Sequence, residues 1–121
     1  EPATSGELPK PQAEPKSVGR IPRITRLMAL AIKFDGYVRD GIVADYAELA
    51  RAGHVTRARI TQIMDLNLLA PDIQEAILSL PRTVRGRDPI RERHLRPIAA
   101  APDWKRQRLF WRHTFRPQIV Q

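Results

Sequence analysis

The chain contains no cysteine and no long apolar run, and each absence excludes a class of protein. Without cysteine it can form neither disulfides nor thiolate metal sites, which fits a reducing cytoplasm. No apolar run approaches the ~20 residues that a membrane-spanning helix needs, and the polar first 20 residues lack an apolar signal core. A glycine-rich phosphate loop is also missing, and His54, His94 and His113 lack metal-ligand spacing. We therefore expect no enzyme, no cofactor and no metal.

Proline is scarce in the middle of the chain and frequent at its start. Pro2, Pro9, Pro11 and Pro15 lie in a stretch with few apolar side chains, which predicts a disordered linker over residues 1–21. The chain begins with Glu1 instead of methionine, which fits a piece of a longer protein. Its 121 residues are enough for one small domain, which we place at residues 22–116, followed by a tail at 117–121.

Apolar residues recur at helical spacing, and no alternating strand pattern of useful length is present. Pro22 and Pro71 suit helix starts because their fixed φ matches a first turn. Predicted helices cover residues 23–39, 45–52, 56–66, 71–80, 90–100 and 103–114. The expected fold is all-α, a compact cluster of five to six short helices. Trp104, Trp111 and Phe115 share one side of the last helix, so we expect them in the core rather than stacked on bases.

The positive charge is confined to the C-terminal third of the chain. Residues 1–81 carry ten basic and ten acidic side chains, whereas residues 82–121 carry 11 basic and three acidic ones. The net charge of +8 therefore lies behind residue 81, and 17 of the 21 cations are arginine. Arginine forms forked contacts with phosphates and bases, and such an asymmetry is typical of proteins that bind nucleic acid.

Residues 45–66, DYAELARAGHVTRARITQIMDL, have the pattern of a helix-turn-helix. Leu49 and Ala50 give the first helix an apolar face. Gly53 and His54 form the turn, and Gly53 is the residue able to take the positive φ of a helix end. Thr56 is a favourable N-cap for the second helix. The inner face of that helix is formed by Ile60, Ile63 and Met64.

The outward face of the second motif helix has the residue types that read bases in a major groove. Arginine contacts guanine, glutamine contacts adenine, and threonine or alanine contacts the thymine methyl group. No acidic residue occurs between Val55 and Met64. An ordinary helical hairpin with a solvated basic face is the alternative interpretation. The predicted base-reading residues are Thr56, Arg57, Ala58, Arg59, Thr61 and Gln62.

A second set of residues is suited to contacts with the DNA backbone. The loop of residues 82–89 concentrates arginines, and their mutual repulsion is relieved only when a polyanion binds. The predicted backbone contacts are Tyr46, His54, Arg82, Arg85, Arg87, Arg106 and Arg108.

Residues 48–77, ELARAGHVTRARITQIMDLNLLAPDIQEAI, resemble the central helix-turn-helix of ParB-type partition proteins. The chain is more similar still to the C-terminal region of some bacterial serine site-specific recombinases, through the segments 26–38, 48–57, 68–78 and 103–108. This resemblance implies duplex DNA binding with the second motif helix in the major groove. The catalytic serine domain of recombinases and the nucleotide-binding and clamp-forming parts of partition proteins are absent. In addition, His54 follows Gly53 where such motifs have leucine and then glycine.

These observations predict a sequence-specific double-stranded DNA-binding protein of a mobile element, phage or plasmid. It would act as a regulator, a partition-type factor or a recombination accessory in the bacterial cytoplasm, associated with nucleoid or plasmid. The expected partners are duplex DNA, a second copy of the chain, and a recombinase or partition protein. A helical protein-interaction adaptor and an RNA-binding protein are the alternatives.

Overall fold

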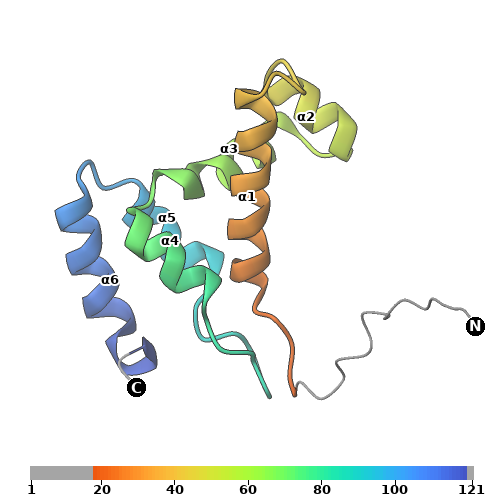
Figure 1. Ribbon diagram of the computed structural model, residues 1–121. Helices are drawn as coiled ribbons and strands as arrows, with labels where there is room; N and C mark the ends of the chain where they lie inside the picture. Colours follow the sequence, from red (N-terminus) through yellow and green to blue (C-terminus); the bar gives the residue numbers. More distant parts are fainter. Residues whose placement is uncertain (1–17, 120–121) are drawn as a thin grey trace, which may run out of the picture.

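The computed structural model describes the backbone of residues 18–119 and the side chains of residues 18–115, and its regular elements in this range are helical. In chain order they are α1 (Arg23–Arg39), α2 (Tyr46–Gly53), α3 (Arg57–Met64), the 3-10 helix η2 (Asp65–Leu68), α4 (Pro71–Leu78), α5 (Glu92–Ala99) and α6 (Trp104–Ile119) (Figure 1). The all-α prediction is confirmed. None of these described helices is long and apolar enough to cross a membrane.

The predicted bounds of α1 are confirmed at both ends. Pro22 precedes the first turn, and its carbonyl accepts the amides of Thr25 and Arg26. The helix ends at Arg39, and Gly41 then takes a φ of 77°, a backbone region that glycine adopts without steric cost. With 17 residues, α1 is about 25 Å long, and it runs along most of the molecule (Figure 1).

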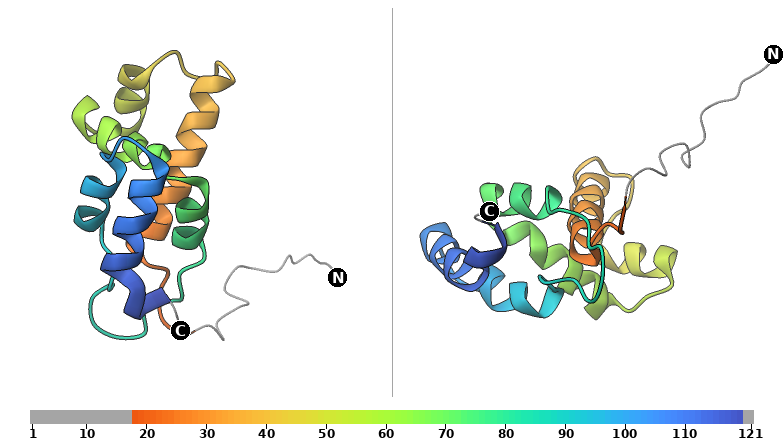
Figure 2. Two further views of the ribbon diagram at one scale, coloured as in Figure 1. Left: turned by 90° about the vertical axis from the view of Figure 1, so that its left-hand side faces the viewer. Right: turned by 90° about the horizontal axis from the view of Figure 1, so that it is seen from below.

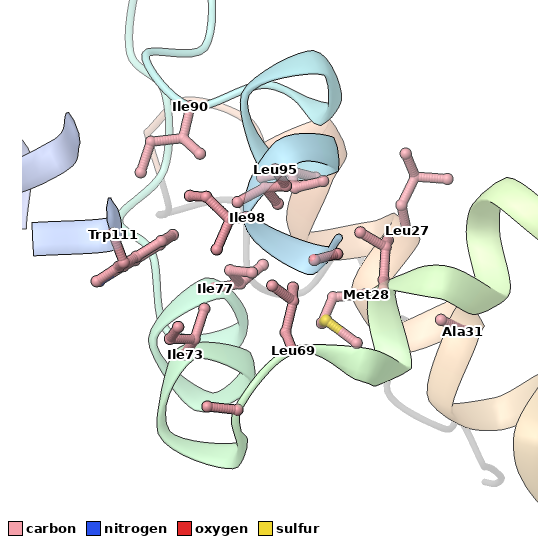
Figure 3. Packing of buried hydrophobic residues seen from close by; sticks show 14 of the residues in the cluster. Leu27, Met28, Ala31, Leu69, Ile73, Ile77, Ile90, Leu95, Ile98 and Trp111 are labelled. Atoms are coloured by element: carbon pink, nitrogen blue, oxygen red, sulfur yellow. The ribbon is translucent and has the colours of Figure 1, made fainter. Parts of the chain in front are cut away.

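The main hydrophobic core lies between α1, η2, α4, α5 and α6. In Figure 3, Leu95 and Ile98 of α5 approach Ile73 and Ile77 of α4, and Trp111 of α6 borders the same cluster. The core also contains Ile24, Leu27, Met28, Ala31, Ile63, Leu66, Leu69, Ala70, Ile90, Ala99 and Phe115. These buried side chains join η2 and α4 to the first half of α1, and they join α6 to α5.

The expectation that three aromatic residues of α6 enter the core is confirmed for Trp111 and Phe115 and is wrong for Trp104. The rings of Trp111 and Phe115 are in edge contact, with their centroids 4.7 Å apart, and both residues are almost fully buried. Trp104 is the first residue of α6 and is 50% exposed, with the Arg108 guanidinium 5.9 Å from its ring centre. At this end of the helix the indole lies beside a cation and solvent instead of in the core.

A second, smaller cluster holds α2 against α3 and the second half of α1. Leu49, Ala50, Ile60 and Met64 are its buried members, as the helix-turn-helix pattern predicts. Ile63, expected between the same two helices, is buried in the main core instead. Ile60 and Ile63 lie about 60° apart around the helix axis, and Ile63 is the one on the side of the main core. α3 is therefore fixed from two sides.

The segment before α1 is attached to the basic loop. Arg20 and Thr83 exchange two backbone hydrogen bonds of 3.0 and 2.8 Å in an antiparallel bridge. Asp88 accepts the Arg23 amide at 2.9 Å and also the Thr83 hydroxyl, which lowers the pKa of its carboxyl group. The folded part thus begins before residue 22, because this bridge orders residues within the predicted linker. Residues 1–17 lie outside the described residues.

Other element ends also differ from the sequence expectations: α4 ends at Leu78 instead of residue 80, and α5 begins at Glu92 instead of residue 90. The predicted helix over residues 56–66 ends at Met64 and tightens into η2. At the other end of the chain, α6 continues to Ile119, past the expected end near residue 114 and into the predicted tail.

Candidate nucleic-acid interface

The turn of the helix pair is formed by His54 and not by Gly53. α2 continues through Gly53, and His54 then takes the left-handed conformation, with φ 57° and ψ 40°. In this conformation its amide donates to the Arg51 carbonyl at 3.3 Å, and the Val55 amide donates to the Ala50 carbonyl at 3.1 Å. The prediction of a positive φ at Gly53 is wrong, because the helix ends one residue later than its glycine suggests.

The start of each motif helix is capped by a side chain. Asp45 accepts the Glu48 amide at 2.9 Å, and the Glu48 carboxylate accepts the Ala44 amide at 2.7 Å, so both ends of this pair satisfy otherwise free donors. Thr56 accepts the Arg59 amide at 3.0 Å, which confirms the predicted N-cap of α3. These caps fix where α3 begins and which of its residues face solvent.

The predicted division of α3 into an inner and an outer face is confirmed. Ile60, Ile63 and Met64 are buried. The outer residues Thr56, Arg57, Ala58, Thr61 and Gln62 are all exposed, and Arg59 is partly buried. Their role in reading bases stays a prediction.

Arg59 is held by α5 in a network that the sequence did not suggest. Its guanidinium donates to both carboxylate oxygens of Glu92, at 2.6 and 3.1 Å, and to Gln62 Oε1 at 3.0 Å. Arg96 contacts the same carboxylate at 3.3 Å. The hydrogen bond from Arg59 lowers the pKa of Glu92, and the bond to Glu92 raises the pKa of Arg59. Both groups therefore stay charged near neutral pH.

α5 adds arginines to this face that the sequence analysis did not assign. It lies beside α3, and a groove of about 160 Å³ between them is lined by Gln62, Glu92 and Arg96, among others. Figure 2 shows α2, α3 and α5 along the same edge of the molecule. Arg93 and Arg96 of α5 are both exposed, and Arg96 lines this groove. The dense RERHLR run of residues 91–96 was the available signal, but its neighbour α3 lies about 30 residues earlier.

The predicted backbone-contact residues do not form one cluster. Tyr46 is half-buried beside the second cluster and His54 is exposed, so both lie at the α2 end of the molecule. The loop with Arg82, Arg85 and Arg87 lies at the opposite end of α1 (Figure 1), where Arg82 donates to the Gly19 carbonyl at 3.3 Å.

The two remaining predicted contacts lie on α6. Arg106 is exposed. The Nε of Arg108 donates to both carboxylate oxygens of Asp72 at 2.9 and 3.0 Å, which lowers the pKa of Asp72. The Arg108 guanidinium is therefore already engaged by α4.

Within the described part of the chain, no three His, Asp or Glu side chains are grouped closely enough to hold a metal ion. Comparisons of the chain with protein-family models, with curated proteins and with solved structures found no match.

Proposed function

We propose that this protein binds double-stranded DNA in a sequence-specific way and has no catalytic role. The observation that carries the proposal is the outer face of α3, where exposed residues able to contact bases lie beside the arginines of α5. Two acidic residues line the groove of this surface: Glu92, which binds Arg59 and Arg96, and the exposed Asp65, whereas Arg57 and Arg93 add two further positive charges. The surface therefore keeps an excess of positive charge, as binding to a polyanion requires.

In the proposed complex the first two turns of α3 enter the major groove. Arg57, Ala58, Thr61 and Gln62 face the base edges, while Arg93 and Arg96 of α5 contact phosphates beside the groove. The protein acts by binding alone, as a regulator, a partition-type factor or a recombination accessory of a mobile element, phage or plasmid. This role places it on the nucleoid or on a plasmid.

The separation between α2 and the basic loop suggests how the duplex runs. Both lie near opposite ends of α1, which is about 25 Å long. One turn of duplex DNA spans about 34 Å. A duplex that follows the edge formed by α2, α3 and α5 therefore reaches the loop within one turn, and phosphates there meet Arg85 and Arg87.

Selection of bound sequences from a random duplex pool tests the proposed function. We expect an enriched motif that is lost when Arg57, Thr61 and Gln62 are replaced together by alanine. Retention of the folded helices by this variant is checked by circular dichroism. Enrichment of no motif by the parent protein would contradict sequence-specific binding, and failure to bind duplexes at all would contradict DNA binding.

Replacing Arg85 and Arg87 by alanine should weaken binding to every duplex and reduce its salt dependence. Each phosphate contact contributes about 0.9 to the slope of log affinity against log salt, so we expect the slope to fall by nearly 2. The measurement is a titration at several salt concentrations. Lys33→Ala with Arg39→Ala removes the same charge from α1, outside the proposed interface, and should leave the slope nearly unchanged. Equal slopes for the two double variants would exclude the loop from the interface.

An adaptor function is favoured by one observation on α6. Leu109 and Phe110 are neighbours on this helix and are exposed by 57% and 40%, and Trp104 at its start is exposed by 50%. Exposed apolar side chains gathered on one element are typical of surfaces that bind proteins. If the chain is an adaptor, Leu109→Ser with Phe110→Ser should abolish capture of its protein partner, and duplex DNA should not compete for that partner. An RNA-binding function would instead appear as a preference for hairpin loops over duplex DNA.

A further inference from the structure

The contact between Arg59 and Glu92 determines which hydrogen bonds α3 can offer to a base. A guanidinium carries five N–H donors. In Arg59, two N–H groups bind the Glu92 carboxylate and a third binds Gln62 Oε1. The Nε–H group and one N–H group of Nη2 make none of these hydrogen bonds, and both lie on the same edge of the guanidinium. Arg59 therefore keeps a pair of parallel donors even though its ion pair is complete.

Gln62 loses its use as an acceptor in the same network. Its amide offers two N–H donors and one oxygen with two lone pairs. Arg59 donates to one of these lone pairs, and the positive charge of its guanidinium beside the oxygen disfavours the partly positive hydrogen of a second N–H donor. A glutamine that reads adenine needs this oxygen for the N6 amino group and a donor for N7. The held Gln62 has only its donors to offer.

Glu92 is the residue that holds this arrangement in place. Its side chain is 14% exposed and that of Arg59 is 25% exposed, so the pair is largely shielded from solvent. Three contacts, two from Arg59 and one from Arg96, surround the carboxylate. Releasing Arg59 to a base would leave this partly buried carboxylate short of its main partner beside DNA phosphates, which is costly. The network should therefore persist in the complex.

We propose that Glu92 is a positioning residue that gives α3 a preference for guanine. Glu92 aligns the guanidinium of Arg59. Through Arg59 it also engages the Gln62 oxygen, so that Gln62 contacts a base through its N–H donors. Both side chains then match the N7 and O6 acceptors of guanine and not the acceptor-and-donor edge of adenine. This inference rests on the proposed function, since it specifies the bases that the same surface reads.

The test compares motifs selected from random duplexes by the parent, by Gln62→Met and by the double variant Arg59→Met with Glu92→Met. The base pair of the motif at which Gln62→Met no longer shows a preferred base is the one that Gln62 reads. We expect guanine there in the parent, preferred by about 5- to 150-fold. In the double variant the Gln62 oxygen is released, so this position should change to adenine, and a guanine read by Arg59 should disappear.

The double variant removes both charges of the shielded pair together and replaces them with unbranched side chains; Arg96, which also loses Glu92 as a partner, is 55% exposed and can be solvated. Glu92→Gln is the milder companion: it keeps an oxygen acceptor for Arg59 but weakens the contact, so the guanine preference should fall by less. Thermal unfolding of each variant verifies the fold. A structural role alone would lower the affinity for all duplexes without changing the preferred base.

The outcomes separate this inference from the function on which it rests. Adenine at the Gln62 position of the parent motif overturns the inference and leaves sequence-specific binding intact. A parent motif that neither Glu92→Gln nor the double variant alters overturns it as well. If the parent binds duplexes without preference, the proposed base reading fails and the inference fails with it.

Discussion

Replacing Ile60 by asparagine should destabilise the protein by about 3–5 kcal/mol and abolish duplex binding. Ile60 is 1% exposed and lies in the small cluster that joins α2 to α3. The change removes apolar contacts with Leu49 and Met64 and buries an amide for which this cluster provides no partner. Urea or thermal unfolding followed by circular dichroism gives the stability change.

Thr61→Asn is the matched control, because it introduces the same side chain at the next, exposed position of α3. Its effect on stability should stay within about 0.5 kcal/mol, as for other exposed positions. If Ile60→Asn unfolds at the same denaturant concentration as the parent, then Ile60 does not lie in a core between α2 and α3.

Replacing Gln107 by leucine should cost about 2–4 kcal/mol, although it adds an apolar side chain to the interior. Gln107 is 2% exposed, and its Oε1 accepts the buried Ala70 amide at 2.8 Å. Its Nε2 donates to the carbonyls of Leu68 and Ala101 at 3.1 and 3.4 Å. Leucine leaves these backbone groups buried without their partner, and the loss falls on the contact between α6 and the chain entering α4.

The same change at an exposed position, Gln62→Leu, serves as the control for stability and should alter it by less than about 0.5 kcal/mol. Chemical denaturation of both variants under identical conditions provides the comparison. A Gln107→Leu variant at least as stable as the parent would mean that its amide does not link α6 to residues 68–70.

Local signals in the sequence were sufficient for most of the helices. Pro22 and Gly41 bound α1, and Thr56 caps α3, because a helix end depends on the few residues around it. The exact turn was less predictable: Gly53 has the intrinsic preference for a positive φ, yet His54 adopts it. Which of the two residues adopts the positive φ depends on whether α2 ends before or after Gly53. Local residue preferences do not determine the length of a helix to one residue.

The residues of the candidate site could be predicted from the sequence, but the contacts between them could not. The outer face of α3 follows from helical periodicity, so Arg57 and Gln62 were identified correctly as exposed. Arg59 belongs to the same face, but its partner Glu92 is 33 residues away in the sequence. The buried Gln107 was missed for the same reason. Such pairings depend on how helices pack, which periodicity does not encode.

The unequal size of the two hydrophobic clusters has a consequence for local opening. α2 contributes buried side chains only to the small cluster, whereas α3 is also anchored in the main core through Ile63. A fluctuation that detaches α2 therefore exposes few apolar groups, and it leaves α4, α5 and α6 packed. Amide protons of α2 should therefore exchange with solvent through this local opening. Amide protons of α4 should exchange only when the whole protein unfolds. The molecule thus combines a rigid body with one helix that can readjust next to α3.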